Sequence, residues 1–246
     1  MTTIAIIGGT GLTNLETLDI LRKEVLHTPF GEASGPVTHG RLAGKDVAFI
    51  ARHGYGHTIP PHKVNYRANL WALKSVGATK VLAVAAVGAI NRELTPGSLA
   101  LPDQIIDYTY GRKQTYFEED LDHVTHIDFT YPYSLDLRTT LVQAAKNSQI
   151  SFYDGGTYGA TQGPRLETAA EIQRMKKDGC DMVGMTGMPE AVLARELGLS
   201  YAAITVMANW AAGIEAGEIT MEDIQANLSA GMGDVKKVIQ QLMLLI

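Results

Sequence analysis

Long apolar runs separated by short turns organise this chain and predict a sheet of buried strands. The runs at 47–51, 80–87 and 201–207 are apolar at almost every position, as expected of strands that are covered on both faces. A similar run at 4–7 leads into the turn Gly8-Gly9-Thr10-Gly11. Shorter runs predict additional strands at 25–26, 37–41, 99–101 and 182–183.

Helices are predicted between these strands, and their order favours one class of fold. The helix expected at 66–76 is stopped by Gly77. Because helices alternate with strands in the second half, we expect an α/β fold with a largely parallel sheet covered by helices. The length of 246 residues favours a single domain over residues 1–246. The other predicted helices cover 134–146, 167–179, 189–197 and 221–245, the last with a candidate break near Gly231-Met232-Gly233.

The stretch from Asp107 to Tyr133 fits neither pattern. It holds seven aromatic residues, which would be costly to leave in water. Irregular segments of this length in compact domains are usually functional or lie at an interface. The sequence therefore predicts a functional or subunit-contact segment here.

Composition and charge exclude several classes of function. The net charge is -5 and no long basic tract is present, which argues against nucleic acid or an anionic membrane as partner. Cys180 is the only cysteine, so neither an intrachain disulfide nor a cysteine metal cluster can form. The sequence has no signal-peptide pattern and no apolar run of membrane-spanning length, so we expect a cytoplasmic protein.

Arg52-His53-Gly54 is the segment most suggestive of chemistry. It follows the strand predicted at 47–51, and in open α/β sheets ligands bind beyond the carboxyl ends of the strands. An arginine fork beside an imidazole donor suits a phosphate or a carboxylate. The histidines His53, His57 and His62 also suggest a metal, but Arg52 would repel a cation. We therefore expect an anion site with His53 as donor and no metal.

Weaker signals follow other predicted strands, and each has an ordinary structural alternative. The turn around Thr10 lacks the glycine pattern of a dinucleotide-binding loop, but its amides could hold one anion. Thr186 lies near a predicted helix N-terminus, where simple capping is the alternative. Asn209 follows the strand at 201–207, and its carboxamide could read a heterocyclic base or be an ordinary loop residue. Glu167 is expected at a helix start, where the helix dipole favours an acid.

In their order along the chain these motifs resemble the purine nucleoside phosphorylase superfamily, in its methylthioadenosine and methylthioinosine phosphorylase branch. The resemblance implies one α/β domain with a mixed, twisted sheet flanked by helices, and a homotrimer. It implies that inorganic phosphate attacks the anomeric carbon of a nucleoside, with no cofactor and no metal. The matching segments are Ile6-Ile7-Gly8-Gly9-Thr10-Gly11-Leu12, Arg52-His53-Gly54 with His57, Lys63 to Asn69, Trp71 to Lys74, Ala86-Val87-Gly88, Thr125-His126-Ile127, Gly163-Pro164-Arg165, Met185-Thr186, Pro189-Glu190 and Leu193-Ala194.

The resemblance also implies roles for individual residues. Asn209, Arg52 and His53 take the catalytic roles. His126 is expected to come from a neighbouring subunit. Phosphate would be bound by Thr10, Arg52, His53, Ala85, Ala86 and Thr186, the nucleoside by Met185, Asn209, Trp210, Ala211, Leu166 and His126, and specificity set by Glu167, Met221 and Ile224.

Two departures from the adenine-specific pattern bear on the substrate. Adenine-specific members carry two aspartates where this chain has Asn209 and Ala211, and a threonine where it has Ala85. A carboxylate would repel the 6-oxo group of hypoxanthine, whereas a carboxamide can donate to it. We therefore expect phosphorolysis of methylthioinosine to hypoxanthine and 5-methylthioribose 1-phosphate, a step of purine salvage. An inosine and guanosine phosphorylase, a methylthioadenosine phosphorylase and a nucleoside-binding module without activity are the alternatives.

Overall fold

The computed structural model describes residues 4–10, 12, 18–119 and 121–246. Within this part of the chain, eleven strands form one mixed sheet, whose main path runs β10-β8-β13-β7-β1-β6-β5-β2, and β3 and β4 form a separate pair. The strands are β1 Ile4–Gly8, β2 Asp19–Glu24, β3 His27–Thr28, β4 Gly31–Glu32, β5 Val37–Leu42, β6 Lys45–Ala51, β7 Lys80–Ala89, β8 Leu99–Leu101, β9 Gln104–Asp107, β10 Phe152–Asp154, β11 Thr157–Ala160, β12 Met182–Gly184 and β13 Ser200–Trp210. The helices are α1 Tyr66–Ser75, α2 Leu135–Asn147, α3 Ala169–Lys177, α4 Gly187–Glu196 and α5 Met221–Leu245, with a short 3₁₀ turn at Pro61–Lys63.

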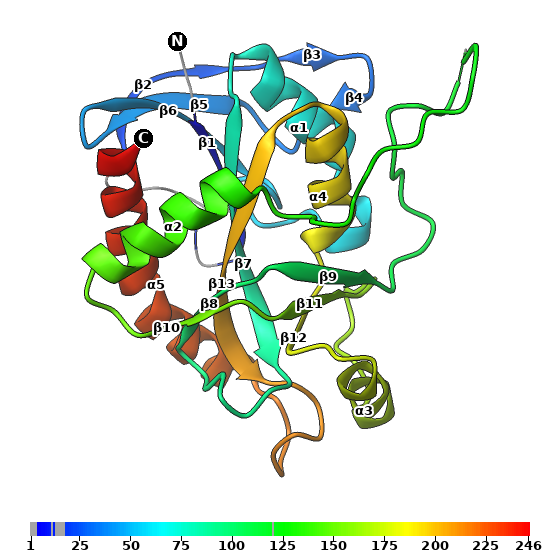
Figure 1. Cartoon of the computed structure of the whole chain (residues 1–246), viewed down its shortest axis with the longest axis vertical. Coiled ribbons are helices and arrows are strands. Elements are labelled where there is room, and N and C mark those ends of the chain that lie inside the picture. The colour runs from blue at the N-terminus through cyan, green and yellow to red at the C-terminus, as the bar shows by residue number, and fades with distance from the viewer. Residues whose placement is uncertain (1–3, 11, 13–17, 120) are drawn as a thin grey trace.

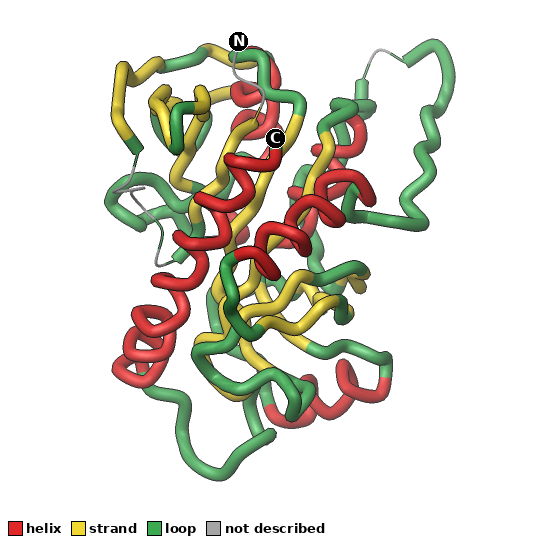
Figure 2. Tube along the Cα trace, turned by 60° about the vertical axis from the view of Figure 1, so that its left-hand side comes forward, coloured by secondary structure: helices red, strands yellow, loops and turns green. Residues whose placement is uncertain are grey.

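The sheet lies between two layers of helices. Helices α2 and α5 cover one face, and α1 and α4 cover the other (Figures 1 and 2). In β1, Ile4 and Ile6 pack into the cluster under α2 and α5, whereas Ala5 and Ile7 pack toward α1 and α4. This alternation is why the central strands are apolar at successive positions. The prediction of an α/β fold with a mixed sheet flanked by helices is confirmed.

Two local predictions were wrong. Residues 25–26 lie between β2 and β3 rather than in a strand. Helix α5 continues without a break through Gly231. A Cβ at Gly231 would lie 2.5 Å from Cγ1 of Val206, so this glycine allows α5 to pack closely against β13. The glycine therefore marks a close contact and not the end of the helix.

Strand β7 changes partners along one edge, and this change creates the space for a site. Its first half pairs in parallel with β1 through Lys80–Ala83, and its end pairs antiparallel with β12 through Gly88 and Ala89. On the other edge it pairs with β13 along its whole length. Residues 84–87 therefore lie in a gap between β1 and β12. Such switch points are where open α/β sheets bind ligands.

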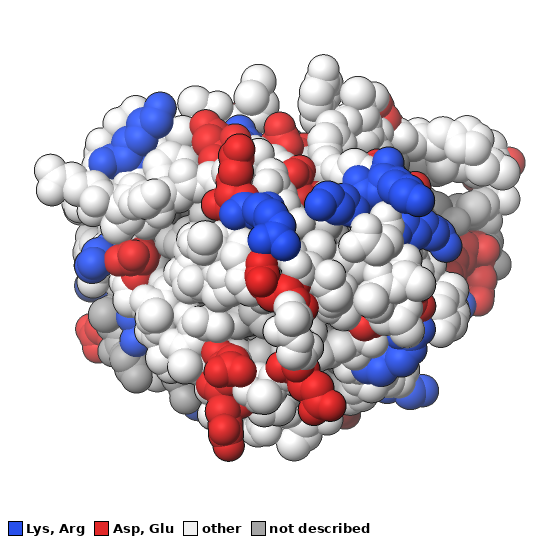
Figure 3. Space-filling view, turned by 90° about the horizontal axis from the view of Figure 1, so that it is seen from below, with Lys and Arg blue, Asp and Glu red and all other residues white. Residues whose placement is uncertain are grey.

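The segment 108–133 forms a long excursion at the side of the molecule, without a helix or strand among its described residues (Figure 1). On the face shown in Figure 3, Lys and Arg side chains are mixed with Asp and Glu side chains. No helix in the described ranges has the length and apolar character to cross a membrane. No cluster of three or more His, Cys, Asp or Glu suited to a metal ion occurs among the residues that the structure describes.

Candidate active site

A cavity of about 430 Å³ opens at the gap beside β7. It brings together residues from the turn after β1, the end of β6, the loop before α3, the start of α4, the end of β13 and the start of α5. Among the residues predicted to form a site, those that line it are Thr10, Arg52, His53, Ala85, Ala86, Leu166, Glu167, Met185, Thr186, Asn209, Ala211, Met221 and Ile224.

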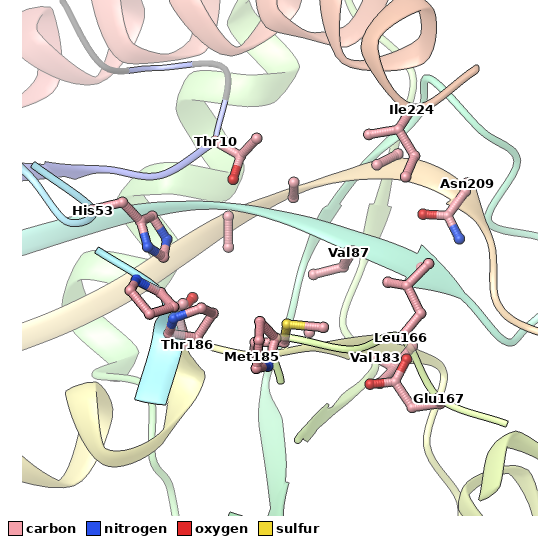
Figure 4. A pocket seen from close by; sticks show the side chains of 18 of the residues that line it. Thr10, His53, Val87, Leu166, Glu167, Val183, Met185, Thr186, Asn209 and Ile224 are labelled. Carbon is pink, nitrogen blue, oxygen red and sulfur yellow. The ribbon is translucent and has the colours of Figure 1, made fainter. Parts of the chain in front are cut away.

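The cavity has two chemically different ends (Figure 4). Thr10, His53 and Thr186 gather at one end, called here the Thr10 end. Asn209 and Glu167 lie at the other, called here the Asn209 end. Met185 lies between the two ends. The cavity can therefore hold an elongated ligand whose two ends differ in polarity.

Arg52 lines the cavity at the Thr10 end and forms a buried ion pair with Glu190. Its Nε and Nη2 donate to the two carboxylate oxygens of Glu190, both at 2.7 Å, and both side chains are only 1% exposed. Nη1 donates to the carbonyl of Val84 in β7 at 2.9 Å, and Tyr201 Oη donates to Glu190 at 2.9 Å. Burial acts to lower the pKa of Arg52, but the Glu190 carboxylate outweighs it and raises that pKa above its ordinary value. The guanidinium is thus a fixed cation.

This arrangement changes the role expected for Arg52. Three of its five N–H groups are used within the chain, and the charge of Glu190 balances its own. A ligand at the Thr10 end would meet an oriented but largely compensated cation. Gly9 allows the close fit, because a Cβ there would lie 2.6 Å from Arg52 Nη1. Sequence reasoning gave Glu190 no role, and the only signal was its place within the Met185 to Glu190 motif.

His53 presents an acceptor, not the donor expected from the sequence. Its ring Nδ1 lies 2.8 Å from the carbonyl oxygen of Ile59, which can only accept, so Nδ1 carries the hydrogen. Burial and the neighbouring charge of Arg52 lower the pKa of His53 to about 4, so the ring is neutral at pH 7. In the neutral ring Nε2 is then a hydrogen-bond acceptor. The site can pair this nitrogen with a ligand that carries a proton.

The two threonines at the Thr10 end present their side chains to the cavity. Thr186 is the N-cap residue of α4, yet its side chain makes no capping hydrogen bond, so the simple capping alternative does not hold. Its backbone N–H donates to Tyr158 Oη at 3.3 Å. Thr10 Oγ1 lies 3.5 Å from Nε2 of His57. Hydroxyl groups that face a cavity beside a guanidinium suit an oxyanion.

At the Asn209 end, a β-bulge decides which side chains face the cavity. The pairing of β13 with β7 shifts register between Met207 and Asn209, so that consecutive residues Ala208 and Asn209 both line the cavity. Asn209 Nδ2 donates to the carbonyl of Trp210 at 2.7 Å, which leaves Oδ1 and one N–H of the carboxamide. Ala211 is buried and adds no polar group.

Glu167 is not at a helix start. Helix α3 begins two residues later, at Ala169, where Thr168 and Glu171 form a reciprocal capping box. The Glu167 carboxylate instead lines the cavity and accepts a hydrogen bond of 2.6 Å from the Thr161 hydroxyl. The sequence does contain a signal for this boundary, because Thr168 followed three residues later by Glu171 is a capping-box pattern that starts the helix after Glu167.

Two predicted residues do not line the cavity. Trp210 ends β13 and packs its partly buried ring into the hydrophobic clusters. The contact of Trp210 with a nucleoside stays a prediction. His126 is exposed on the 108–133 excursion, away from the cavity of its own chain.

The cleft lies at a sheet switch point, with an arginine and hydroxyls at one end and a carboxylate and a carboxamide at the other, an arrangement that suits a nucleoside phosphorylase. The chain belongs to the Phosphorylase superfamily, whose model matches residues 3–243. It is 53% identical over 243 residues to a probable S-methyl-5'-thioinosine phosphorylase of Pseudomonas syringae pv. tomato, with 99% of each chain covered.

Other similar proteins are named for different substrates. A 6-oxopurine nucleoside phosphorylase of Pyrococcus furiosus is 43% identical, covering 97% of this chain and 91% of its own. The solved structure of a methylthioadenosine phosphorylase from Schistosoma mansoni in complex with adenine has a TM-score of 0.95 at 30% identity. That comparison covers 100% of this chain and 92% of the other.

Replacing Glu190 by glutamine tests the buried ion pair. Glu190→Gln keeps the shape of the side chain but leaves the Arg52 charge uncompensated in the core, so we expect a loss of about 3–5 kcal/mol in the free energy of unfolding. Chemical denaturation at pH 7 measures it. Tyr201→Phe is the matched control, because it removes one hydrogen bond to the same carboxylate and should cost only about 1 kcal/mol. Equal losses in the two variants would contradict the ion-pair interpretation.

The lowered pKa of His53 predicts how stability depends on pH. The unfolded ring takes up a proton near its ordinary pKa of 6.5, whereas the folded ring does so only near 4. The contribution of His53 to the free energy of unfolding is thus fully present above pH 6.5. It falls by on the order of 3 kcal/mol as the pH is lowered to 4. His53→Gln should flatten the decline in urea-unfolding free energy between pH 6.5 and 4. An unchanged slope would show that the folded imidazole titrates normally.

Proposed function

We propose that this protein catalyses the phosphate-dependent cleavage of S-methyl-5'-thioinosine into hypoxanthine and 5-methylthioribose 1-phosphate. The observation that carries the proposal is the pairing of a carboxylate and a carboxamide, Glu167 and Asn209, at one end of the cavity. The relative of 53% identity named for this activity supports the same conclusion.

The base fits this pair through its hydrogen-bonding edge. Hypoxanthine presents an N–H at N1 and a carbonyl at C6. The Glu167 carboxylate, already held by Thr161, accepts from N1–H, and the Asn209 amide donates to the 6-oxo group. Adenine presents the reverse pattern, with a lone pair at N1 facing the carboxylate. One unpaired buried group costs about 1–3 kcal/mol, enough to favour the 6-oxopurine roughly tenfold or more.

Phosphate occupies the Thr10 end in this proposal. Thr10, Thr186 and the remaining N–H groups of Arg52 donate to its oxygens, together with the backbone at Ala85 and Ala86. Nε2 of the neutral His53 accepts from the protonated oxygen of hydrogen phosphate. Such a site holds the nucleophile against the anomeric carbon and stabilises the positive charge that develops on the sugar.

The leaving base takes the electron pair of the glycosidic bond, so it needs a donor as the bond breaks. Asn209 has one N–H beyond the one bonded to Trp210, and this N–H, donated to the 6-oxo group, stabilises the negative charge that spreads over the departing purine. This is the catalytic role proposed for Asn209. Arg52 and His53 act at the other end on phosphate, and no step requires a cofactor.

The 5'-substituent separates this substrate from inosine. Met221 and Ile224 line the cavity from the start of α5, and two apolar side chains suit a methylthio group better than a hydroxyl. Glu167 and Asn209 alone would suit a 6-oxopurine nucleoside phosphorylase equally well, the activity for which the Pyrococcus furiosus relative is named. An inosine and guanosine phosphorylase is therefore the second candidate.

A side-by-side assay with methylthioinosine, methylthioadenosine and inosine, with and without phosphate, tests the proposal. We expect cleavage only with phosphate and the highest kcat/KM for methylthioinosine. The double variant Asn209→Asp with Ala211→Asp should shift the ratio toward methylthioadenosine roughly tenfold or more, because a carboxylate accepts from the 6-amino group and opposes the 6-oxo group. The KM for phosphate is the internal control. A wild-type preference for methylthioadenosine would contradict the substrate assignment.

We further propose that the protein is a homotrimer whose contacts include the 108–133 excursion, with His126 reaching the cavity of a neighbouring subunit. Large apolar side chains at Val124, Tyr131 and Leu135 are 71%, 68% and 76% exposed, which is unfavourable in an isolated chain. Light scattering should give three times the chain mass of 26.6 kDa. His126→Ala should raise the KM for the nucleoside without changing that mass. A monomer with full activity would overturn this proposal.

A further inference from the structure

Arg112 extends from the 108–133 excursion into the space between two loops of the candidate active site. Its Nη1 donates to the carbonyls of Met185 at 2.8 Å and Met188 at 2.6 Å. Its Nη2 donates to the carbonyls of Thr161 at 3.1 Å and Gln162 at 2.8 Å, and Nε donates to the Gln162 side chain at 3.1 Å. One guanidinium therefore joins the chain after β11 to the chain after β12.

Four of the six hydrogen-bond partners of Arg112 are backbone carbonyls, and the other two are the Gln162 side chain and the Tyr66 hydroxyl at 3.3 Å. No ion pair between Arg112 and a carboxylate is present among the described residues. The cation is instead solvated by carbonyl dipoles, and its guanidinium carbon lies 5.6 Å from the centre of the Tyr66 ring. A planar fork can serve four carbonyls on two loops at once, whereas an ammonium group cannot. Arginine is thus needed for its geometry as well as its charge.

Both loops carry residues of the nucleoside-binding part of the cavity. The chain after β12 bears Met185, which lies between the two ends of the cavity. The chain after β11 leads to Leu166 and Glu167, and Thr161, whose carbonyl Arg112 binds, holds the Glu167 carboxylate through its hydroxyl. A shift of either loop would change the distance between Met185 and Glu167.

The Thr10 end is held by other contacts. Arg52 is fixed by Glu190 and Val84, and His53 by the carbonyl of Ile59. None of these contacts involves Arg112. Thr186 lies between Met185 and Met188, two of the Arg112 partners, but its backbone N–H is held separately by the Tyr158 hydroxyl at 3.3 Å. Loss of the Arg112 guanidinium should therefore disturb the sugar and base positions more than the phosphate position.

We propose that Arg112 is a positioning residue for nucleoside binding, which sets the spacing between Met185 and the Glu167 loop by bridging their backbones. The proposal rests on the proposed function in that the ligand is a nucleoside. It gives the 108–133 excursion a task within its own subunit, separate from any subunit contact.

Kinetics of Arg112→Met and Arg112→Lys test this role. For Arg112→Met we expect the KM for the preferred nucleoside to rise roughly tenfold or more, because several hydrogen bonds of about 1 kcal/mol each are lost. The KM for phosphate should stay within about threefold and the fall in kcat should be smaller than the rise in KM. The KM of Arg112→Lys for the nucleoside should lie between those of Arg112→Met and the wild type. In a third variant, Arg112→Ala, added methylguanidinium should partly restore the low KM.

Arg67→Met is the matched control. Arg67 also holds the excursion, through the Thr115 carbonyl at 3.4 Å and Glu118 at 3.0 Å, but it does not touch the two loops. It should leave both KM values unchanged. If Arg112→Met and Arg67→Met had the same effect, or if the two KM values of Arg112→Met rose equally, the positioning role would be wrong.

Calorimetric titration with nucleoside in the absence of phosphate separates this inference from the proposed function. Weaker binding by Arg112→Met than by wild type would support the positioning role even if the wild type showed no phosphorolysis. Unchanged binding would overturn the positioning role even if phosphorolysis were confirmed. Thermal melting of each variant checks that the titrated protein is folded.

Discussion

The buried ion pair between Arg52 and Glu190 is the constraint on which the rest of the site depends. A charge that is removed from water is tolerated only with an opposite charge and further hydrogen bonds, so the two side chains must stay in register. Arg52 directly follows β6, Glu190 lies in α4, and Val84 in β7 accepts a further hydrogen bond from Arg52. The pair thereby fixes the relative positions of three elements that form the walls of the cavity.

The same pair determines the electrostatic character of the Thr10 end. Glu190 balances the charge of Arg52, and burial beside that cation keeps His53 neutral at pH 7. Binding an anion there depends on oriented hydrogen bonds more than on net positive charge. Such hydrogen bonds are already oriented, so they need no rearrangement when charge develops in the transition state. They can therefore lower the reaction barrier as well as bind the anion. In the proposed function, the Glu167 carboxylate and the Asn209 carboxamide recognise the base at the Asn209 end through directed hydrogen bonds.

Arginine forks that bind backbone carbonyls recur at the site. Arg52 binds the unpaired edge of β7 at Val84, and Arg112 binds backbone carbonyls that follow β11 and β12. In both places regular pairing stops, so carbonyl groups would otherwise lack donors away from water. Irregular backbone around a cavity can be rigid when a side chain supplies the missing hydrogen bonds. The 108–133 excursion, irregular by itself, contributes one of these side chains.

Local pattern was enough to predict the α/β class, the central strands and the residue types at the ends of 47–51 and 201–207, because apolar periodicity and turn residues are local properties. The order of motifs was also enough to indicate the family. Only the tertiary structure decided that Glu190 partners Arg52, that His53 is an acceptor, that a bulge turns Asn209 into the cavity, and that Glu167 faces it. The Arg52–Glu190 pair joins distant parts of the chain, and Asn209 depends on a shift in strand register. His53 and Glu167 depend on the loop conformations that bring them to Ile59 and Thr161, which apolar periodicity does not record.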